Sequence, residues 1–198
     1  MADRSTRPAP TDRRTQRTRN ALRGALLALM HEVGWDEIDV RRICARADVG
    51  RSTFYNHFTS KDDLLSGSFD DLRRRLREGA RAGSRHDAGA AAPSPRQGRP
   101  RLVFALGLME HAWENRRLFR TLIGRRSGHA VHERFKQMVV ALVDDDLADI
   151  PAGVPRDATV RWTAGALFEL LIWWMEARNP VPPEQLLAML QRLAPARA

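Results

Sequence analysis

Apolar and polar positions repeat at helical spacing along most of the chain, and no stretch alternates long enough to predict a β-strand. The first predicted helix covers residues 11–32, with Leu22, Leu26 and Leu29 on its buried side. Later helices are predicted at 101–114, 116–123, 130–149 and 156–178, and a short one follows the Pro182–Pro183 pair. The pattern therefore predicts an all-α protein.

Residues 38–65 carry the most informative pattern in the chain. Four apolar positions are spaced i, i+3, i+4 and i+7, namely Val40, Ile43, Cys44 and Ala47. They predict a short helix with one buried face, which the turn Asp48-Val49-Gly50 ends. A second short helix is predicted at 51–57 with Phe54 and Phe58 inward, and Ser60 is expected to cap a third. This arrangement predicts a helix-turn-helix whose second helix enters a DNA major groove.

The second helix of this motif would expose side chains that can hydrogen-bond a phosphate or a base edge. They are Arg51, Ser52, Thr53, Tyr55, Asn56 and His57. Arg41, Arg42 and Gly50 are predicted to join this surface from the first helix and the turn. Lys61 opens the third helix, where exposed backbone N–H groups suit a phosphate. The alternative for the whole set is an ordinary solvated face.

The same stretch resembles the TetR family of bacterial transcriptional regulators. The resemblance runs from Gly34-Trp35 to Leu64-Leu65, and the string TFYNHFTSKDDLL is its most diagnostic part. It implies an N-terminal DNA-binding domain in which Tyr55, His57 and Lys61 clamp phosphates, and dimerisation through the last two long helices. Two positions depart from the family pattern: Asp39 stands where a Thr commonly caps the helix, and Asp48 replaces a turn Gly. Aspartate suits both roles, but Asp39 places a negative charge where the family often contacts phosphate.

Composition divides the chain into five segments. We expect a disordered basic arm at 1–10, the three-helix DNA-binding domain at 11–60 and a connecting helix at 61–82. Small residues and prolines predict a flexible linker at 83–100. Residues 101–198 would form a helical domain for ligand binding and dimerisation.

Charge and cysteine content agree with a protein that binds nucleic acid in the cytoplasm. The formal net charge is +9, with 18 basic against 12 acidic residues up to Arg85 and 15 against 12 after it. The alternative is a purely solubilising charge. Cys44 is the one cysteine, so no intramolecular disulfide can form and a reducing compartment is expected. No apolar run is long enough to predict a membrane span.

The predicted helix at 156–178 is apolar nearly all round, so both of its sides require cover. A body of five helices cannot wrap it alone, and a second subunit is the simplest cover. The chain is therefore predicted to form a homodimer. The expected interface residues are Ala166, Leu170, Trp173, Leu186 and Leu190.

Two polar residues, His111 and Glu169, interrupt apolar faces of the predicted body. A buried carboxylate needs a partner, which could be an arginine, the other subunit or a ligand. Seven apolar residues could line a ligand cavity with them, although core packing is the alternative: Phe104, Leu108, Phe119, Phe135, Met138, Trp162 and Phe168.

The sequence thus predicts a transcriptional regulator, a repressor that leaves a palindromic operator when a small apolar effector of unknown identity binds. The alternative is a cytosolic small-molecule-binding or scaffold protein with only non-specific nucleic-acid contacts. No catalytic residues, metal ligands or cofactor are predicted, because no motif for enzymatic chemistry is present.

Overall fold

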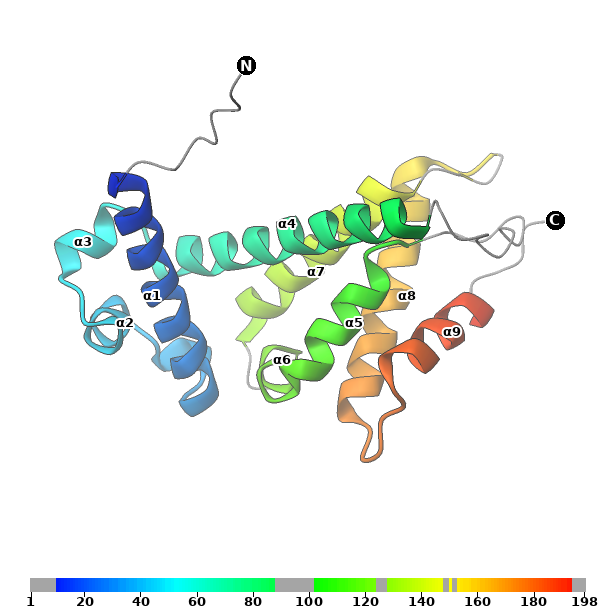
Figure 1. Ribbon diagram of the computed structural model, residues 1–198. Helices are drawn as coiled ribbons and strands as arrows, with labels where there is room; N and C mark the ends of the chain where they lie inside the picture. Colours follow the sequence, from blue (N-terminus) through cyan, green and yellow to red (C-terminus); the bar gives the residue numbers. More distant parts are fainter. Residues whose placement is uncertain (1–9, 88–101, 124–127, 148–149, 151–152, 194–198) are drawn as a thin grey trace, which may run out of the picture. The chain divides into compact units, whose positions relative to one another are not determined.

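The computed structural model describes residues 10–87, 102–123, 128–147, 150 and 153–193. In this part of the chain every regular element is a helix, which confirms the predicted all-α class (Figure 1). None of these helices is long and apolar enough to cross a membrane. In order they are α1 (Pro10–Glu32), the 3₁₀ helix η1 (Trp35–Glu37), α2 (Val40–Ala47), α3 (Arg51–Tyr55), α4 (Lys61–Asp87), α5 (Ala105–Glu114), α6 (Arg116–Ile123), α7 (Gly128–Asp146), α8 (Arg156–Glu176) and α9 (Pro183–Leu193).

Most helix boundaries lie within three residues of their predicted positions, and α7 and α8 end three and two residues before the predicted ends. Helix α3 ends at Tyr55, two residues before the predicted end, and α5 begins at Ala105 instead of 101. Helix α4 continues to Asp87 and so includes the first residues of the predicted linker. The rest of that linker, and the predicted arm up to residue 9, lie outside the described residues.

The chain divides into two compact units, Met1–Ser68 and Phe69–Ala198, and the division falls within α4. The first unit has a small core to which each of its α-helices contributes a fully buried side chain. These are Leu22 and Leu26 of α1, Ile43 of α2, Phe54 of α3 and Leu64 of α4, each 0% exposed. Burial of these side chains supplies the main driving force for packing the short α2 and α3, which would be unstable alone.

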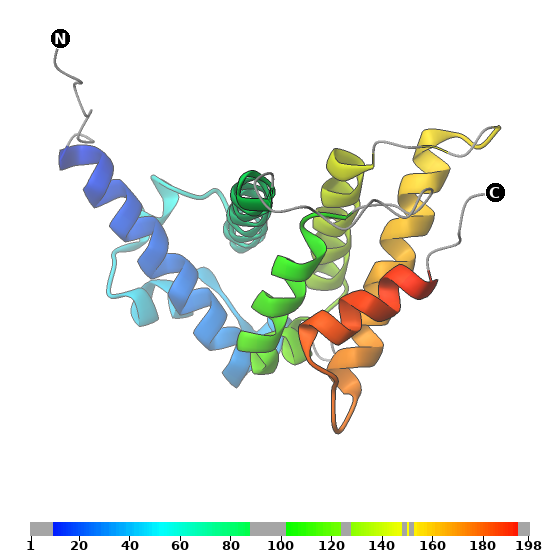
Figure 2. The ribbon, with the colours of Figure 1, turned by 45° about the vertical axis from the view of Figure 1, so that its right-hand side comes forward.

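In the second unit α7 packs along α8, while α9 lies against α5 (Figure 2). Phe135 of α7 is the centre of an aromatic cluster, with ring centroids 5.9 Å from Phe69, 5.6 Å from Phe119 and 5.7 Å from Phe168. The four rings come from α4, α6, α7 and α8, so the cluster joins four helices of this unit.

Three consecutive aspartates at the end of α7 bind three different elements of the second unit. Asp144 accepts a hydrogen bond from Arg156 Nε at the start of α8, at 3.0 Å. Asp145 accepts one from Arg73 Nη2 of α4, at 2.6 Å. Asp146 accepts from the two backbone N–H groups just before α5, at 2.8 and 3.3 Å. The end of α7 therefore fixes α4, α5 and α8 at once.

Candidate nucleic-acid interface

Helix α2 begins at a side-chain cap. Asp39 has an extended backbone, and its Oδ1 accepts a hydrogen bond from the backbone N–H of Arg42 at 2.7 Å. This hydrogen bond holds the pKa of the Asp39 carboxyl below its usual value, with smaller contributions from the Arg41 and Arg42 charges. The aspartate thus performs the capping role expected of it.

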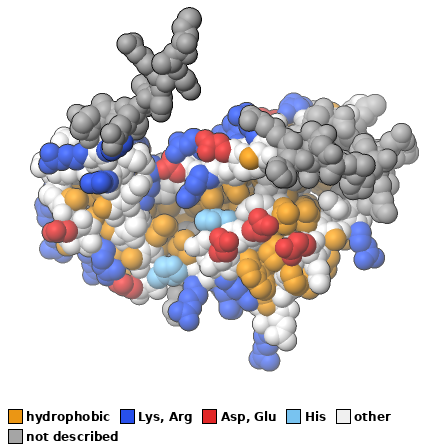
Figure 3. Space-filling model, in the orientation of Figure 1, with side chains coloured by type: hydrophobic (Ala, Val, Ile, Leu, Met, Phe, Trp, Pro, Cys, Tyr) orange, Lys and Arg blue, Asp and Glu red, His pale blue; other side chains and the backbone are white. Residues whose placement is uncertain are grey.

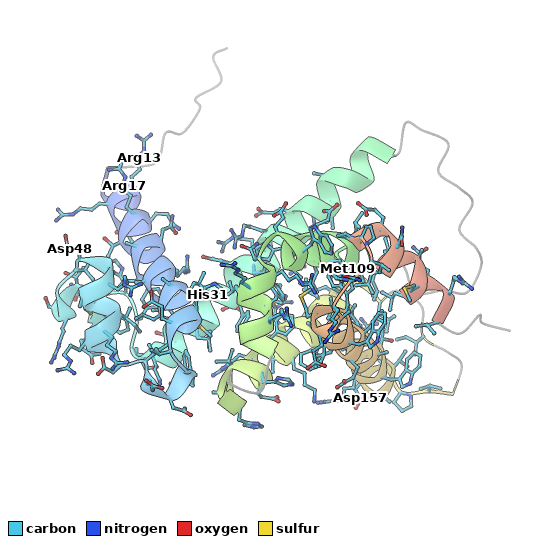
Figure 4. The ribbon with its side chains drawn as sticks, turned by 90° about the horizontal axis from the view of Figure 1, so that it is seen from below. Arg13, Arg17, His31, Asp48, Met109 and Asp157 are labelled. Atoms are coloured by element: carbon cyan, nitrogen blue, oxygen red, sulfur yellow. The ribbon has the colours of Figure 1, made fainter. Side chains whose placement is uncertain are left out.

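The turn between α2 and α3 depends on Asp48 (Figure 4). Its backbone is left-handed, with φ 53° and ψ 49°, and its N–H donates to the carbonyl of Ala45 at 3.4 Å. Gly50, in contrast, is extended at φ −71°, and a Cβ placed there would make only ordinary contacts. The conformational demand of the turn therefore falls on Asp48 and not on the glycine.

Replacing Asp48 with valine should destabilise the protein by about 1–2 kcal/mol, because a β-branched residue is strained in the left-handed region. Asp48 is exposed, so the substitution removes no core packing. Asp48→Gly is the matched control and should be as stable as the wild type or more so. Urea unfolding followed by circular dichroism measures the free energy of unfolding of both variants. Equal stability of the valine and glycine variants would contradict the prediction that valine is strained at this position.

Helix α3 buries two phenylalanines and presents its polar side chains to solvent. Phe54 is 0% exposed, and Phe58 just after the helix is 3% exposed. Tyr55 packs its ring edge-to-face on Phe54 at 5.4 Å yet remains 58% exposed. Of the other predicted DNA contacts on this segment, Arg51, Ser52 and Asn56 are exposed, while Thr53 and His57 are half-buried.

The arginines of α2 differ in how many donors they keep for a partner. Arg46 is bound through two hydrogen bonds, of 2.8 and 2.6 Å, to the carboxylate of Glu32. Arg42 donates one hydrogen bond to the carbonyl of Glu37 at 2.9 Å, and its other N–H donors remain available. Arg41 is exposed, and its Nη2 lies 3.9 Å from a carboxylate oxygen of Asp39. Arg41 and Arg42 thus remain candidates for phosphate contact, while Glu32 balances the charge of Arg46.

The start of α4 differs from the open phosphate site that the sequence predicts. Ser60 Oγ accepts from the backbone N–H of Asp63 at 3.1 Å, and Asp63 Oδ2 accepts from the backbone N–H of Thr59 at 2.8 Å. This side-chain capping occupies one backbone N–H group of the helix start, that of Asp63. The Lys61 ammonium points inward and donates to the carbonyls of Trp35 and Ile38. In this conformation the Lys61 side chain binds backbone carbonyls, and a phosphate contact at this helix start stays a prediction.

Two further cations belong to the candidate interface and were not singled out from the sequence. Arg13 and Arg17 are exposed near the start of α1, where the sequence pattern places them only among a group of basic residues (Figure 4). Residues four apart on a helix lie on one face. Because the helix begins at Pro10, they are held on a regular element.

The predicted ligand residues of the second unit are mostly core residues. Phe104, Leu108, Phe119, Phe135, Met138 and Phe168 are each at most 5% exposed. His111 is half-buried, with its ring 5.7 Å from Phe119 and its Nδ1 3.2 Å from Asn115 Nδ2. Burial lowers the pKa of His111, and the charge of Arg75 lowers it further, so the neutral imidazole is favoured.

Three predicted residues lie elsewhere than expected. Trp162 is 57% exposed and Glu169 is also exposed, so neither joins the buried cluster. Their positions on α8 place them with Ala166, away from the side that packs on α7. Leu186, predicted at the dimer interface, is 0% exposed within its own chain. Its side chain fills the core beneath α9 and has no surface left for a partner.

Two segments of the chain match known protein families. Residues 22–67 match "Bacterial regulatory proteins, tetR family", and residues 103–195 match "Transcriptional regulator C-terminal region". An uncharacterised HTH-type transcriptional regulator of Mycobacterium tuberculosis is 34% identical over 65 residues, as is one of Mycobacterium bovis. That alignment covers 33% of this chain and 30% of each relative.

Solved structures share the fold over nearly the whole chain. A TetR transcriptional regulator from Streptococcus agalactiae is 23% identical, with a TM-score of 0.63 over 92% of this chain and 96% of that one. The fatty acid degradation regulator FadR from Bacillus halodurans is 16% identical, with a TM-score of 0.64 over 95% and 96%. NalD, the secondary repressor of a multidrug efflux pump in Pseudomonas aeruginosa, is 21% identical, with a TM-score of 0.58 over 90% and 96%. With an N-terminal helix-turn-helix that matches the tetR family and a C-terminal helical region that matches transcriptional regulators, the chain belongs to the TetR family of regulators.

Proposed function

We propose that the protein is a dimeric transcriptional repressor that binds a palindromic operator through α3. The observation that carries this proposal is the division of α3 between a buried and a polar side. Phe54 is fully buried, so the helix is anchored, while Arg51, Tyr55 and Asn56 are exposed. Side chains of these types can bind phosphates and base edges in a major groove.

The proposed dimer uses the exposed side of α8, which we call the α8 outer face: Trp162, Ala166, Glu169, Leu170 and Trp173. Trp162 and Trp173 are 57% and 52% exposed, which is unusual for large aromatic side chains of a soluble domain. Figure 3 shows hydrophobic side chains gathered on the second unit where α5 and α9 lie. An apolar surface of this kind favours contact with another protein surface.

A groove forms part of this surface, and Trp162, Ala166 and Leu170 of the α8 outer face line it. It has a volume of about 330 Å³ and lies between α8, α9 and the start of α5, with Leu187, Leu190 and Leu193 of α9 among its lining. A two-fold dimer brings the same surface of each subunit together, so a groove and exposed tryptophans on one face can complement each other. Such a dimer would present two α3 helices to two half-sites of an operator.

We place the effector at the aromatic cluster around Phe135, where His111 supplies a half-buried polar contact. The rings pack on one another, so a ligand must separate them as it binds. To release DNA, an apolar ligand must bind the form of the dimer with weak operator affinity more tightly than the DNA-bound form. Mass spectrometry of ligands retained by the purified native protein would identify the effector.

The DNA-binding part of the proposal is tested in two steps. The protein selects sequences from a random duplex library, and its footprint is then measured on the most enriched sequence. Protection of a palindrome with two half-sites supports a dimeric regulator that binds an operator. Uniform binding without any selected sequence would leave only a protein with non-specific nucleic-acid contacts.

The exposed residues of α3 should differ in their effects once the operator is known. Arg51→Ala and Asn56→Ala should each lose binding free energy, and the loss should be roughly 1–3 kcal/mol larger on the operator than on random DNA, because each substitution removes a base contact. Tyr55→Ala should weaken binding to both DNAs equally, because Tyr55 contacts phosphate. Titration of each variant against both duplexes gives the comparison, and parallel losses for all three would remove the assignment of base-reading residues.

A further inference from the structure

The groove between α5, α8 and α9 has the size and the lining of a small-molecule site. Its volume of about 330 Å³ falls within the range of about 300–1,000 Å³ that is usual for such sites. Three elements form its walls, with Leu106 near the start of α5, Trp162 and Leu170 on α8, and Leu187 and Leu190 on α9. All three elements belong to the second unit, so the groove lies within one compact body.

A buried hydroxyl group faces this groove. Thr163 of α8 is 6% exposed and is part of the groove lining. Within the described part of the chain, its hydroxyl forms no hydrogen bond. Thr159, one turn earlier, shows the usual alternative on a helix, because its Oγ1 donates to the carbonyl of Pro155 at 3.2 Å. A buried hydroxyl without a partner costs free energy, so a ligand atom that accepts its hydrogen bond would be stabilised there.

The lining also restricts the charge of the ligand. Gln191 of α9 adds an amide group that can donate and accept hydrogen bonds. None of the described residues that line the groove is charged. An ionised group would lose its hydration there and find no counter-ion, so the groove disfavours anions and cations alike. The ligand that fits is uncharged and mostly apolar, with a carbonyl or hydroxyl oxygen that accepts from Thr163.

We propose that this groove binds an uncharged, mostly apolar small molecule through a hydrogen bond from the Thr163 hydroxyl. The groove shares no residue with the aromatic cluster around Phe135, where we place the effector, so it is a second site. Trp162 and Ala166 line the groove and also belong to the α8 outer face, so the ligand lies against the proposed subunit contact. Ligand binding and dimerisation are then thermodynamically linked, and this consequence alone rests on the proposed dimer.

Three naphthalenes substituted at the same ring carbon test the chemistry of the site. Acetylnaphthalene carries a ketone that accepts a hydrogen bond, ethylnaphthalene lacks the acceptor, and naphthoate is an anion. Equilibrium dialysis with the full chain at physiological ionic strength measures the affinity of each. Acetylnaphthalene should bind about fivefold more tightly than ethylnaphthalene, the gain expected from one neutral hydrogen bond, and naphthoate should bind most weakly. Absence of acetylnaphthalene binding, or tightest binding by naphthoate, would overturn the proposal.

Thr163→Val locates the ligand, because valine replaces the hydroxyl with a methyl group of similar size. It should weaken acetylnaphthalene binding about fivefold and leave ethylnaphthalene binding nearly unchanged, which also shows that the groove is intact. Thr159→Val is the matched control on the same helix, since the Thr159 hydroxyl is paired with Pro155 and does not line the groove. The control should bind both compounds as the wild type does. Acetylnaphthalene affinity that Thr163→Val leaves unchanged would place the ligand elsewhere and contradict the inference.

The dependence on protein concentration separates a small molecule from a second subunit as the occupant of the groove. Side chains of a partner that filled the groove would exclude the ligand, so its affinity would fall as the protein dimerises, and the proposal would fail. The proposed site predicts a ligand affinity that stays constant or rises with protein concentration, because a second subunit would cover the bound ligand. None of these measurements uses DNA. Failure to bind an operator would leave the ligand site standing, and absence of the ligand site would leave the repressor proposal standing.

Discussion

Replacing Ala166 with aspartate is expected to convert the proposed dimer into monomers and to abolish operator binding. Ala166 is exposed between Trp162 and Leu170 on the α8 outer face. In a two-fold dimer this position would be covered twice, once in each subunit, so each subunit would bury a new carboxylate without a partner. Sedimentation velocity at micromolar concentration measures the assembly, and titration with the selected duplex measures DNA binding. The DNA-binding unit is unchanged, so a loss there must follow from the loss of the dimer.

Ala188→Asp is the matched control for this experiment. Ala188 is exposed on α9 and does not line the groove between α5, α8 and α9. The control should remain dimeric and bind DNA as the wild type does. If Ala166→Asp also remains dimeric, the α8 outer face is not the interface, and another surface, such as that of α7, would have to join the subunits.

Replacing Trp174 with alanine should cost about 3–5 kcal/mol of unfolding free energy, the largest effect that we expect from a single core change. Trp174 is 0% exposed, and its ring stacks on Trp113 of α5 with centroids 5.7 Å apart and an angle of 19°. Its Nε1 donates to the carbonyl of Val181 at 2.7 Å, after the end of α8. The substitution therefore leaves a cavity and an unpaired carbonyl together. Urea unfolding gives the value.

The neighbouring Trp173 is a natural comparison because it lies on a different side of α8 and is 52% exposed. Trp173→Ala should leave the stability of an isolated subunit nearly unchanged and weaken the dimer. Its melting temperature should therefore depend more steeply on protein concentration than that of the wild type. A large loss of stability that is independent of concentration would show that Trp173 supports its own subunit.

The faces of α8 illustrate what the sequence alone could predict. Helical spacing assigns Val160, Ala164, Leu167 and Leu171 to one side, and all four are buried in the structure. The bounds of α2 and the cap at Asp39 also follow from local pattern, as does the left-handed turn at Asp48. These features depend on residues within one or two helical turns, where spacing and side-chain chemistry determine the outcome.

The features that were not predicted depend on partners that are distant in sequence. The inward direction of Lys61 requires knowing that two carbonyls 26 and 23 residues earlier lie beside it. Spacing places Leu186 on an apolar stripe but cannot tell whether that stripe faces its own chain or a second one. Trp162 and Glu169 were grouped with the buried aromatic residues for the same reason. Identical residue types serve core, interface and ligand site, and only packing distinguishes them.

The three aspartates at the end of α7 also imply an order in which the second unit assembles. Asp144 binds a partner 12 residues away, Asp146 one that is 43 residues away and Asp145 one that is 72 residues away. Closing a longer loop costs more chain entropy, so we expect α8 to join α7 first, α5 next and α4 last. Synthesis on the ribosome proceeds from the N-terminus. Arg73 therefore emerges long before the carboxylate that it binds, and the second half of α4 is the first part of this unit to be made and the last to be fixed.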